Sequence, residues 1–365
     1  MRYYIMFISR KQCVLCQTKA LKTFVTMENF PIKCCNDDQN QHINWNLVIG
    51  NCEYCGSVQQ MNLLNPEILY GGKYPLDTTH SPIWNKHHDD FSDFIKSTLD
   101  TSKHIVEVGS SSQVLIKRLH SLYKNYTVFD FSIETANKLD GVQYIAGNCE
   151  NYQFDSNIVI IMSHVFEHLY DPHKFLENCK NNNVADVIIS IPTMEDLERV
   201  HLTREHTFMY NNNDIWYLFS LYGYKLSSTK TTDFSIFYHF QKTNETEIVE
   251  RTLAPDRYMN SEIYFTKKYT VPEKSFLIGA GFWSQVLLYN ITNKENVIGV
   301  LDNDPTKQGR IYYNTNLMIQ PFLVLKNYDS TTHVLILSNK YWTQEVVQLI
   351  NKINSSIKIV YLNIE

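Results

Sequence analysis

The 365-residue sequence contains no run of lysine or arginine, and its formal net charge is -5 at pH 7. Without a basic patch, bulk electrostatics would hold neither nucleic acid nor an anionic membrane surface. No stretch approaches the roughly 20 apolar residues that a membrane-spanning helix needs. The apolar run in MRYYIMFISRK is too short for a signal peptide and lacks a small-residue cleavage site. We therefore expect a cytoplasmic protein that binds neither nucleic acid nor membrane.

Eight cysteines are present, and four of them stand in two C-x2-C pairs, CVLC and CEYC. The paired residues are Cys13, Cys16, Cys52 and Cys55. Two such pairs offer four thiolates that can close a tetrahedron around zinc, and zinc would supply the folding free energy that a loop-rich segment lacks. The alternative is a redox pair or free thiols, but redox chemistry needs no second copy. Cys34 and Cys35 are adjacent, so both could hardly join one site. We predict a zinc-binding domain over 1–70 with the four paired cysteines as ligands.

Apolar strands alternate with helical patterns from about 101 to 250, after a polar, aromatic connector over 71–100 that carries a helix at 87–99. Such alternation predicts a parallel sheet covered on both faces, with ligands at the carboxyl ends of its strands. A smaller set of strand, glycine turn and helix follows within 251–365. We therefore predict an α/β protein with two Rossmann-like domains. In the central domain the expected strands are 105–108, 126–131, 143–148, the start of 157–169, and 184–192, and a helix is expected over 113–124.

Glycine is scarce at the turn IVEVGSSSQVLIKRL (105–119), where a strand, Gly109 and a helix start would seat a nucleotide-like ligand. A dinucleotide would want G-x-G-x-x-G, because its pyrophosphate needs close backbone approach at two places. S-Adenosylmethionine carries no phosphate and needs one tight turn and an acid for its ribose. Asp130 closes the next strand about 20 residues later, where such an acid should lie. Asn148 and Cys149 follow the third strand, where an adenine edge would lie. We therefore favour S-adenosylmethionine over a dinucleotide.

Histidines follow the fourth strand in SHVFEHLYDP (163–172), where the donor methyl would meet its acceptor. His164 is either a base near that methyl or a loop residue that caps Glu167 or Asp171, and for His168 we favour the cap. His87 and His88 stand beside two aspartates, but a solvated helix start explains them better than a metal site does, because acids early in a helix favour its dipole.

The order of these motifs resembles the three-domain, zinc-containing sugar C-methyltransferases. The similar stretches are NCEYCGSVQQMNLLNPEILY (51–70), KYPLDTTHSPIWNKHHDDF (73–91), an E-x-G turn at 107–109, HLTREHTFMY (201–210), GAGFWSQ (279–285) and DNDPTKQGR (302–310). The resemblance implies a central class I methyltransferase domain that binds S-adenosylmethionine through Glu107, Gly109, Asp130, Asn148, Cys149, His164 and Tyr74. It also implies that a nucleotide-linked 4-keto-deoxysugar is methylated on carbon.

In that family an acid–base pair takes a proton beside the sugar ketone, and the resemblance places it at Glu205 and His206, with His164 a further catalytic candidate. Arg204 could bind a carboxylate or phosphate of the substrate bidentately. Asp302 and Lys307 are expected to face the sugar nucleotide, whereas Gly279 and Gly281 more simply allow tight strand–helix packing than bind a second nucleotide.

The chain departs from the family pattern at three places, one of which is a glycine pair that is absent from TTDFSIFYHF (231–240). Ser111, Ser112 and Gln113 stand where the family has Asn, Asp and Gly, and Thr203 and Arg204 replace its Tyr and His. Three functions therefore compete: C-methylation through an enolate, methylation of a sugar hydroxyl or amine, and a non-catalytic relative that binds a nucleotide sugar or a protein partner.

Overall fold

The computed structural model of the protein forms two compact units. Unit one comprises Met1–Lys22, Asn51–Leu197 and Glu205–Arg257, and unit two comprises Thr23–Gly50, Glu198–Arg204 and Tyr258–Glu365. The residues that the structure describes are 6–33, 44–70, 82–110, 113–133, 138–193, 202–233, 235–244, 248–251, 253, 262–337 and 343–362. The N-terminal segment that we predicted as one domain is thus shared between the two units.

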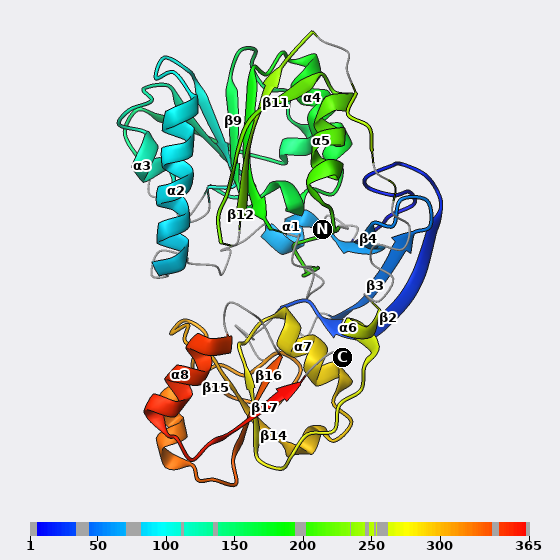
Figure 1. The fold of residues 1–365 in the computed structure, drawn as a ribbon, viewed down its shortest axis with the longest axis vertical. Helices are drawn as coiled ribbons and strands as arrows, with labels where there is room; N and C mark the ends of the chain where they lie inside the picture. Colours follow the sequence, from blue (N-terminus) through cyan, green and yellow to red (C-terminus); the bar gives the residue numbers. More distant parts are fainter. Residues whose placement is uncertain are drawn as a thin grey trace, which may run out of the picture. The chain divides into compact units, whose positions relative to one another are not determined.

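Unit one is built on a seven-stranded sheet whose order is β11-β12-β10-β9-β6-β7-β8 (Figure 1). Its strands are β6 (Ile105–Val108), β7 (Tyr126–Asp130), β8 (Val142–Ala146), β9 (Val159–Ser163), β10 (Asp186–Pro192), β11 (Tyr224–Thr231) and β12 (Ser235–Lys242). The pairs from β10 to β8 are parallel, whereas β12 runs antiparallel to both of its neighbours. The five parallel strands and the mixed α/β class are confirmed. The antiparallel pair β11–β12 was not predicted.

Helices cover both faces of this sheet. Figure 1 shows α2 and α3 on one face and α4 and α5 on the other. Their bounds are α2 (Pro82–Thr98), α3 (Ile116–Leu119), α4 (Pro172–Asn181) and α5 (Asn212–Leu221). Every residue of β10 is buried, because it lies in the middle of a sheet covered on both sides. The expectation of a helix over 113–124 was too long, since regular α-helix is limited to α3.

The connector helix begins earlier than the sequence indicated, at Pro82 rather than near residue 87. His87 and His88 therefore lie inside α2, and both are buried. The interpretation of these two histidines as a solvated helix start was wrong. Further along the same helix, Phe91 and Ile95 join the apolar cluster that includes Phe237 of β12.

The strand order reverses between β6 and β9. From β6 the chain moves outward to β7 and β8, and it then returns to the other side of β6 as β9. In a doubly wound sheet, ligands bind outside the carboxyl ends of the strands at such a switch point. The turns after β6 and β9 are therefore the place where unit one should hold a ligand.

The N-terminal part adds two small sheets. In the first, β1 (Phe7–Ser9) pairs antiparallel with β5 (Asn62–Leu64), which the short helix α1 (Pro66–Tyr70) follows. The second has the order β2-β3-β4, with β2 at Leu21–Pro31, β3 at Asn44–Cys52 and β4 at Val58–Gln60. Two 3₁₀ turns of unit one, η1 (Cys149–Asn151) and η2 (Phe166–His168), follow β8 and β9 respectively.

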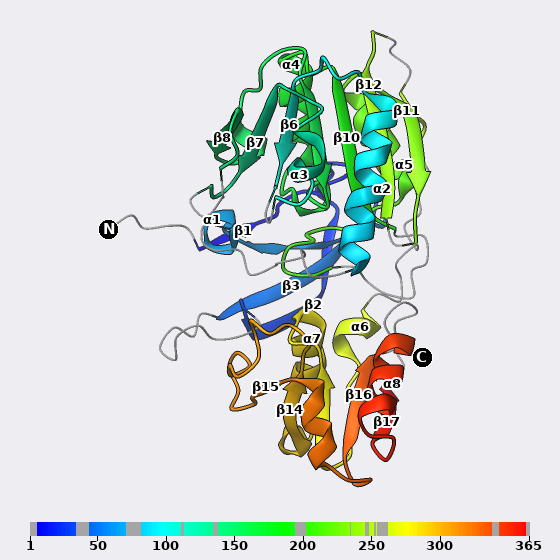
Figure 2. The same ribbon diagram turned by 90° about the vertical axis from the view of Figure 1, so that its left-hand side faces the viewer.

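Unit two repeats the parallel α/β theme with five strands in the order β15-β14-β13-β16-β17 (Figure 2). They are β13 (Ser275–Ile278), β14 (Val297–Leu301), β15 (Ile319–Gln320), β16 (His333–Leu337) and β17 (Lys358–Leu362), and every pair is parallel. The helical segments are α6 (Ile263–Thr266), α7 (Phe282–Asn290), η3 (Lys294–Asn296), η4 (Phe322–Asn327) and α8 (Thr343–Ile353).

Alternating side chains of β13 show that both faces of this second sheet are covered. Leu277 packs in a cluster with Leu287 of α7, whereas its neighbour Phe276 packs in another cluster with Ile350 of α8. Successive strand residues point to opposite faces, so α7 and α8 lie on opposite sides of the sheet. None of the described helices of either unit combines the length and apolar character that crossing a bilayer would require.

Candidate active site and metal centres

The turn after β6 packs closely against the turn after β9. Gly109 has a φ of +76°, and its N–H donates to the carbonyl of Phe129 at 2.8 Å. A Cβ atom at Gly109 would lie 2.4 Å from Cγ2 of Val165. Both the backbone angle and this close approach require glycine. The bend that the sequence predicted is therefore present, and it lies at the switch point.

Gln113 has a left-handed backbone at the position where the family that the sequence resembles has glycine. Its φ is 59°, its N–H donates to the carbonyl of Ser110 at 2.8 Å, and the residue is only 4% exposed. A non-glycine residue in this region costs about 1–2 kcal/mol. The Nε2 atom makes no hydrogen bond within the described part of the chain. Ser111 and Ser112 lie outside the described residues. The turn thus keeps a glycine-like backbone and gains a buried amide with N–H groups to donate.

The acid predicted for a ribose lies at the carboxyl end of the neighbouring strand. Asp130 is the last residue of β7 and is half-buried, and its carbonyl accepts the N–H of Gly147 at 2.9 Å. Asn148 uses its Oδ1 to accept the N–H of Glu150 at 2.9 Å, which caps η1. Cys149 is buried, and burial raises the pKa of its thiol, so the thiol stays protonated. Of the three, Asp130 is the residue suited to bind hydroxyl groups.

Glu107 is held inside the sheet. The side chain is buried, and the hydroxyl of Tyr126 donates to its Oε2 at 2.6 Å. Burial raises the pKa of this carboxyl to about 7, although the hydrogen bond from Tyr126 acts in the opposite direction. The binding of S-adenosylmethionine by Glu107 remains a prediction. Tyr74, the aromatic residue predicted to close over the donor, lies outside the described residues.

A group of buried and half-buried imidazole and indole rings lies beside the end of β9. His164 has a φ of 53°, and its Nε2 lies 2.8 Å from Oγ of Ser235. Its ring packs edge-on against Trp84 at 4.9 Å and His87 at 4.8 Å between centroids. Burial lowers the pKa of His164 to about 3, so the ring is neutral at physiological pH. A neutral imidazole can accept a proton, so the role of a base remains a prediction. The alternative, a contact to Glu167, is present, since Nδ1 of His164 lies 3.2 Å from its Oε1.

The second histidine group is formed by η2 and the segment after residue 201. Glu167, His168 and His206 each offer one ligand atom, and these atoms lie within 4.8 Å of one another. The rings of His168 and His206 are 5.0 Å apart between centroids. Glu205, predicted as the partner of His206, is half-buried. The sequence predicted for Glu167 only a contact with a capping histidine. The Glu-His dipeptide beside the end of a strand was the signal that could have marked Glu167 as a candidate ligand.

The segment that carries His206 is hydrogen-bonded to the residues that follow the second C-x2-C pair. Met209 donates its N–H to the carbonyl of Val58 at 2.8 Å, and Gln60 donates its N–H to the carbonyl of Thr207 at 2.9 Å. The Nε2 of Gln60 donates to the carbonyl of His206 at 3.1 Å. The segment that carries His206 therefore runs along β4, which follows the second cysteine pair directly.

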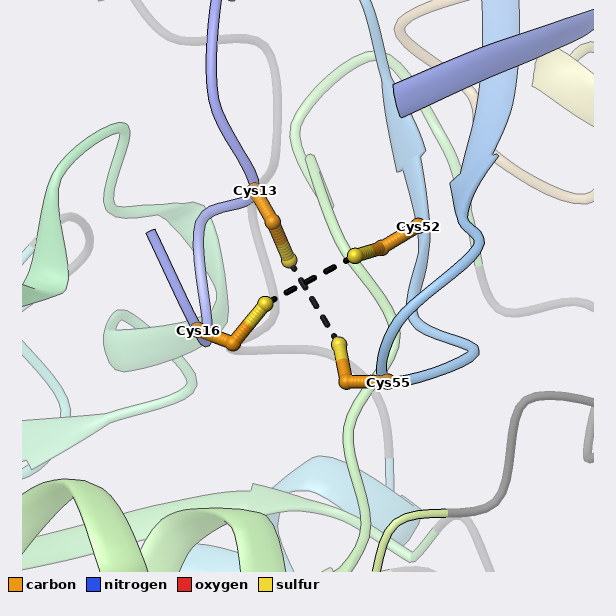
Figure 3. Close-up of side chains that lie close together, drawn as sticks. All are labelled: Cys13, Cys16, Cys52 and Cys55. Atoms are coloured by element: carbon orange, nitrogen blue, oxygen red, sulfur yellow. Dashed lines mark hydrogen bonds between the residues drawn. The ribbon is translucent and has the colours of Figure 1, made fainter. Parts of the chain in front are cut away.

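The four paired cysteines converge on one point and form a group that we call the four-cysteine cluster (Figure 3). The Sγ atoms of Cys13 and Cys55 lie 3.6 Å apart, as do those of Cys16 and Cys52. A zinc tetrahedron with Zn–S bonds of about 2.3 Å has edges of roughly 3.8 Å, so the spacing fits the ion. Three of the four residues are buried, and no disulfide joins them. Cys34 and Cys35 lie outside the described residues.

The predicted substrate residues from the remainder of the chain all belong to unit two. Arg204 is buried, and it donates to Oε1 of Gln285 at 3.2 Å. Asp302 accepts the N–H of Ala280 at 2.7 Å in the turn after β13, and Nζ of Lys307 lies 3.4 Å from the same Oδ2 atom. These contacts hold the second glycine turn together. A role in binding substrate remains a prediction for all three predicted residues.

Comparison with known proteins gives no match to a family or a curated protein, and partial matches to solved structures. Among solved structures, magnesium protoporphyrin IX methyltransferase from Synechocystis PCC 6803 with bound SAH is 11% identical, with 44% of this chain and 84% of that chain covered and a TM-score of 0.37. A SAM-dependent methyltransferase from Aquifex aeolicus is 15% identical over 44% of this chain and 98% of that one, with a TM-score of 0.35. At such values the activity has to be argued from the chain's own residues.

Proposed function

We propose that the protein is an S-adenosylmethionine-dependent methyltransferase that acts on a nucleotide-linked keto-deoxysugar. The observation that carries the proposal is the turn at the switch point. There Gly109 bends the chain against Val165, and Gln113 buries an amide whose Nε2 has no hydrogen-bond partner in the described residues. Asp130 lies at the carboxyl end of the next strand. This arrangement supports a bound nucleoside.

The same turn favours S-adenosylmethionine over a dinucleotide. A pyrophosphate would need a second close backbone approach, but Ser111 and Val114 stand where G-x-G-x-x-G, counted from Gly109, has its other glycines. A donor without phosphate needs only the Gly109 bend. Its ribose hydroxyls would donate to the carboxylate of Asp130, and the Gln113 amide suits an oxygen atom of the donor. Burial without a partner costs a polar group about 1–3 kcal/mol, which a bound oxygen would recover.

The reaction needs a proton acceptor, and the histidines beside the switch point are the candidates for it. The S–CH₃ bond of the sulfonium breaks, a new bond forms from the methyl carbon to the acceptor atom, and the donor leaves as S-adenosylhomocysteine. For carbon methylation an imidazole, that of His164 or His206, first takes the proton from the carbon beside the ketone. The electron pair of the broken C–H bond then forms the enolate, which attacks the methyl carbon. Such a base contributes roughly 10²–10⁴-fold to the rate.

The nucleotide sugar is supported by the order of motifs that the chain shares with the sugar C-methyltransferases. The four-cysteine cluster is the zinc site of that proposal, and its geometry supports the ion. The resemblance proposes contact with the acceptor for the Glu205–His206 pair, Asp302 and Lys307. Arg204 departs from the family pattern, and its guanidinium suits a carboxylate or phosphate of the substrate.

Calorimetry with S-adenosylmethionine and S-adenosylhomocysteine on the full chain tests the donor assignment. We expect both to bind, and NAD⁺ and ATP to leave the heat signal unchanged. If neither sulfur compound binds at millimolar concentration, the methyltransferase proposal is wrong. Once a sugar acceptor turns over, mass spectrometry in deuterated solvent separates the chemistries, because only carbon methylation requires exchange of a C–H proton.

A further inference from the structure

Glu167 is a buried carboxylate without adequate partners. The residue is 0% exposed, and neither of its carboxylate oxygens makes a hydrogen bond within the described part of the chain. Nδ1 of His164 lies 3.2 Å from Oε1, a close contact that lacks hydrogen-bond geometry. A carboxylate removed from water without compensation costs several kcal/mol, so buried carboxylates are paired, protonated or bound to a metal.

Two further ligand atoms lie beside this carboxylate. His168 and His206 each bring a ring nitrogen into a set whose members are all within 4.8 Å of one another. Tyr70 stacks on His168 at 6.2 Å between centroids with an interplanar angle of 11°, which fixes the plane of that ring. The segment of His206 is anchored by the hydrogen bond from Gln60. The ring of His168 and the backbone of His206 are therefore held by separate contacts, as the ligands of a metal site need to be, and Glu167 is placed by η2.

We propose that Glu167, His168 and His206 bind one divalent transition-metal ion, at a site distinct from the four-cysteine cluster. Two imidazoles and one carboxylate suit Fe²⁺, Co²⁺, Mn²⁺ or Zn²⁺, whereas Mg²⁺ and Ca²⁺ prefer sites made of oxygen alone. Three protein ligands leave coordination positions open. The four-cysteine cluster, by contrast, already supplies four ligands and is of the closed, structural kind.

The location gives the ion a role that rests on the proposed function. The set begins in η2, directly after β9, so it lies at the switch point where donor and acceptor would meet. The open positions would take an oxygen of the acceptor, a hydroxyl or the oxygen of an enolate. A metal ion lowers the pKa of a bound hydroxyl and stabilises an oxyanion. Because His206 would then be a ligand, the proton would pass to His164 instead.

Cobalt binding to the full chain loaded with a single equivalent of zinc, which fills the four-cysteine cluster, tests the proposal without donor or acceptor. We expect one Co²⁺ per chain, with visible d–d absorption and without the thiolate charge-transfer band that the four-cysteine cluster would give. The variants Glu167→Gln, His168→Asn and His206→Asn should each weaken binding by at least roughly 10–100-fold, the loss that follows even when an outer-shell partner of a ligand is removed. His120→Asn, a half-buried histidine of unit one outside the set, should bind as the parent does.

Retained zinc content and an unchanged circular dichroism spectrum show that each variant is folded. Equal cobalt affinity in the parent and all three variants would overturn the proposal, as would absorption that comes only from thiolate-bound cobalt. Calorimetry with S-adenosylmethionine on the same samples keeps the two proposals apart. Donor binding without cobalt binding would contradict the metal site alone, and cobalt binding without donor binding would contradict the methyltransferase alone.

Discussion

Gly109 and Val165 meet at the switch point so closely that a Cβ atom on the glycine would lie 2.4 Å from Cγ2 of the valine. The two residues follow β6 and β9, the strands between which the order of the sheet reverses. The turn that would hold the donor therefore cannot move independently of the turn that carries His164. Any side chain at position 109 must displace one of them.

We expect Gly109→Ala to abolish donor binding and to lower the free energy of unfolding more than Gly141→Ala does. Both glycines have a φ of +76°, but a Cβ at Gly141 would meet nothing within 4 Å. The control therefore carries the backbone penalty alone, about 1 kcal/mol or somewhat more. Overpacking against Val165 should add about 1–3 kcal/mol. Urea denaturation and calorimetry with S-adenosylmethionine measure the two effects.

The double variant Gly109→Ala, Val165→Ala separates the two causes. Removing the valine methyl groups should recover the overpacking part of the loss and leave the backbone part. Equal stability of Gly109→Ala and Gly141→Ala would show that the contact between the two turns is not tight.

The four-cysteine cluster should hold one zinc per chain, and its loss should loosen the segment of His206. We expect Cys16→Ser to remove the zinc and to speed hydrogen exchange at the amide of Met209, because that amide donates to Val58 of β4. Structural zinc sites contribute about 10–16 kcal/mol of apparent binding free energy in small finger peptides, so the effect should be large. Elemental analysis and amide exchange measure it.

Cys179→Ala is the matched control, since Cys179 is buried in unit one but lies outside the cluster. It should keep its zinc and the protection of Met209. Zinc loss with unchanged exchange at Met209 would mean that β4 holds the segment of His206 without help from the metal.

The sequence predicted the parallel strands because their signal is local. The apolar run of β9 and the glycine after β6 can each be recognised without knowledge of the rest of the chain. The antiparallel strand β12 was not predicted, because the hydrogen-bond partners of its polar residues, such as His239, lie far along the chain. Its Nε2 lies 2.8 Å from Oδ1 of Asp186, in β10.

The candidate site was predicted in part for the same reason. The C-x2-C pairs have a spacing that indicates zinc by itself. The Glu-His dipeptide after β9 was a local signal for two members of the second histidine group, but the third could not be recognised, because His206 lies far along the chain and is brought close only by the fold. The burial of His87 likewise depended on where α2 begins, and the sequence signal for that start, Ser81 followed by Pro82, was overlooked.

Asp130 should contribute to donor binding through its charge. We expect Asp130→Asn to weaken the binding of S-adenosylmethionine by about 10–100-fold, because hydrogen bonds to a charged group are worth about 1.5–3 kcal/mol. Asp140→Asn is the control, since Asp140 is exposed and lies beyond the carboxyl end of β7. Calorimetry at one ionic strength compares the two. A donor affinity that is the same in both variants would place the ribose elsewhere.

Glu107 should make the stability of the protein fall as the pH rises from about 4.5 to about 7. Burial raises the folded-state pKa of this carboxyl from 4.5 to about 7. Within that window the folded state keeps the proton and the unfolded chain has released it, so the unfolded state binds fewer protons and raising the pH favours unfolding. The change should be on the order of 3 kcal/mol, at about 1.4 kcal/mol per pKa unit.

Glu107→Gln, which keeps an acceptor for the hydroxyl of Tyr126, should flatten this part of the profile, whereas Glu177→Gln on the exposed surface of α4 should not. Urea denaturation at a series of pH values measures the slope, and a slope that survives in Glu107→Gln would assign the titration to another group.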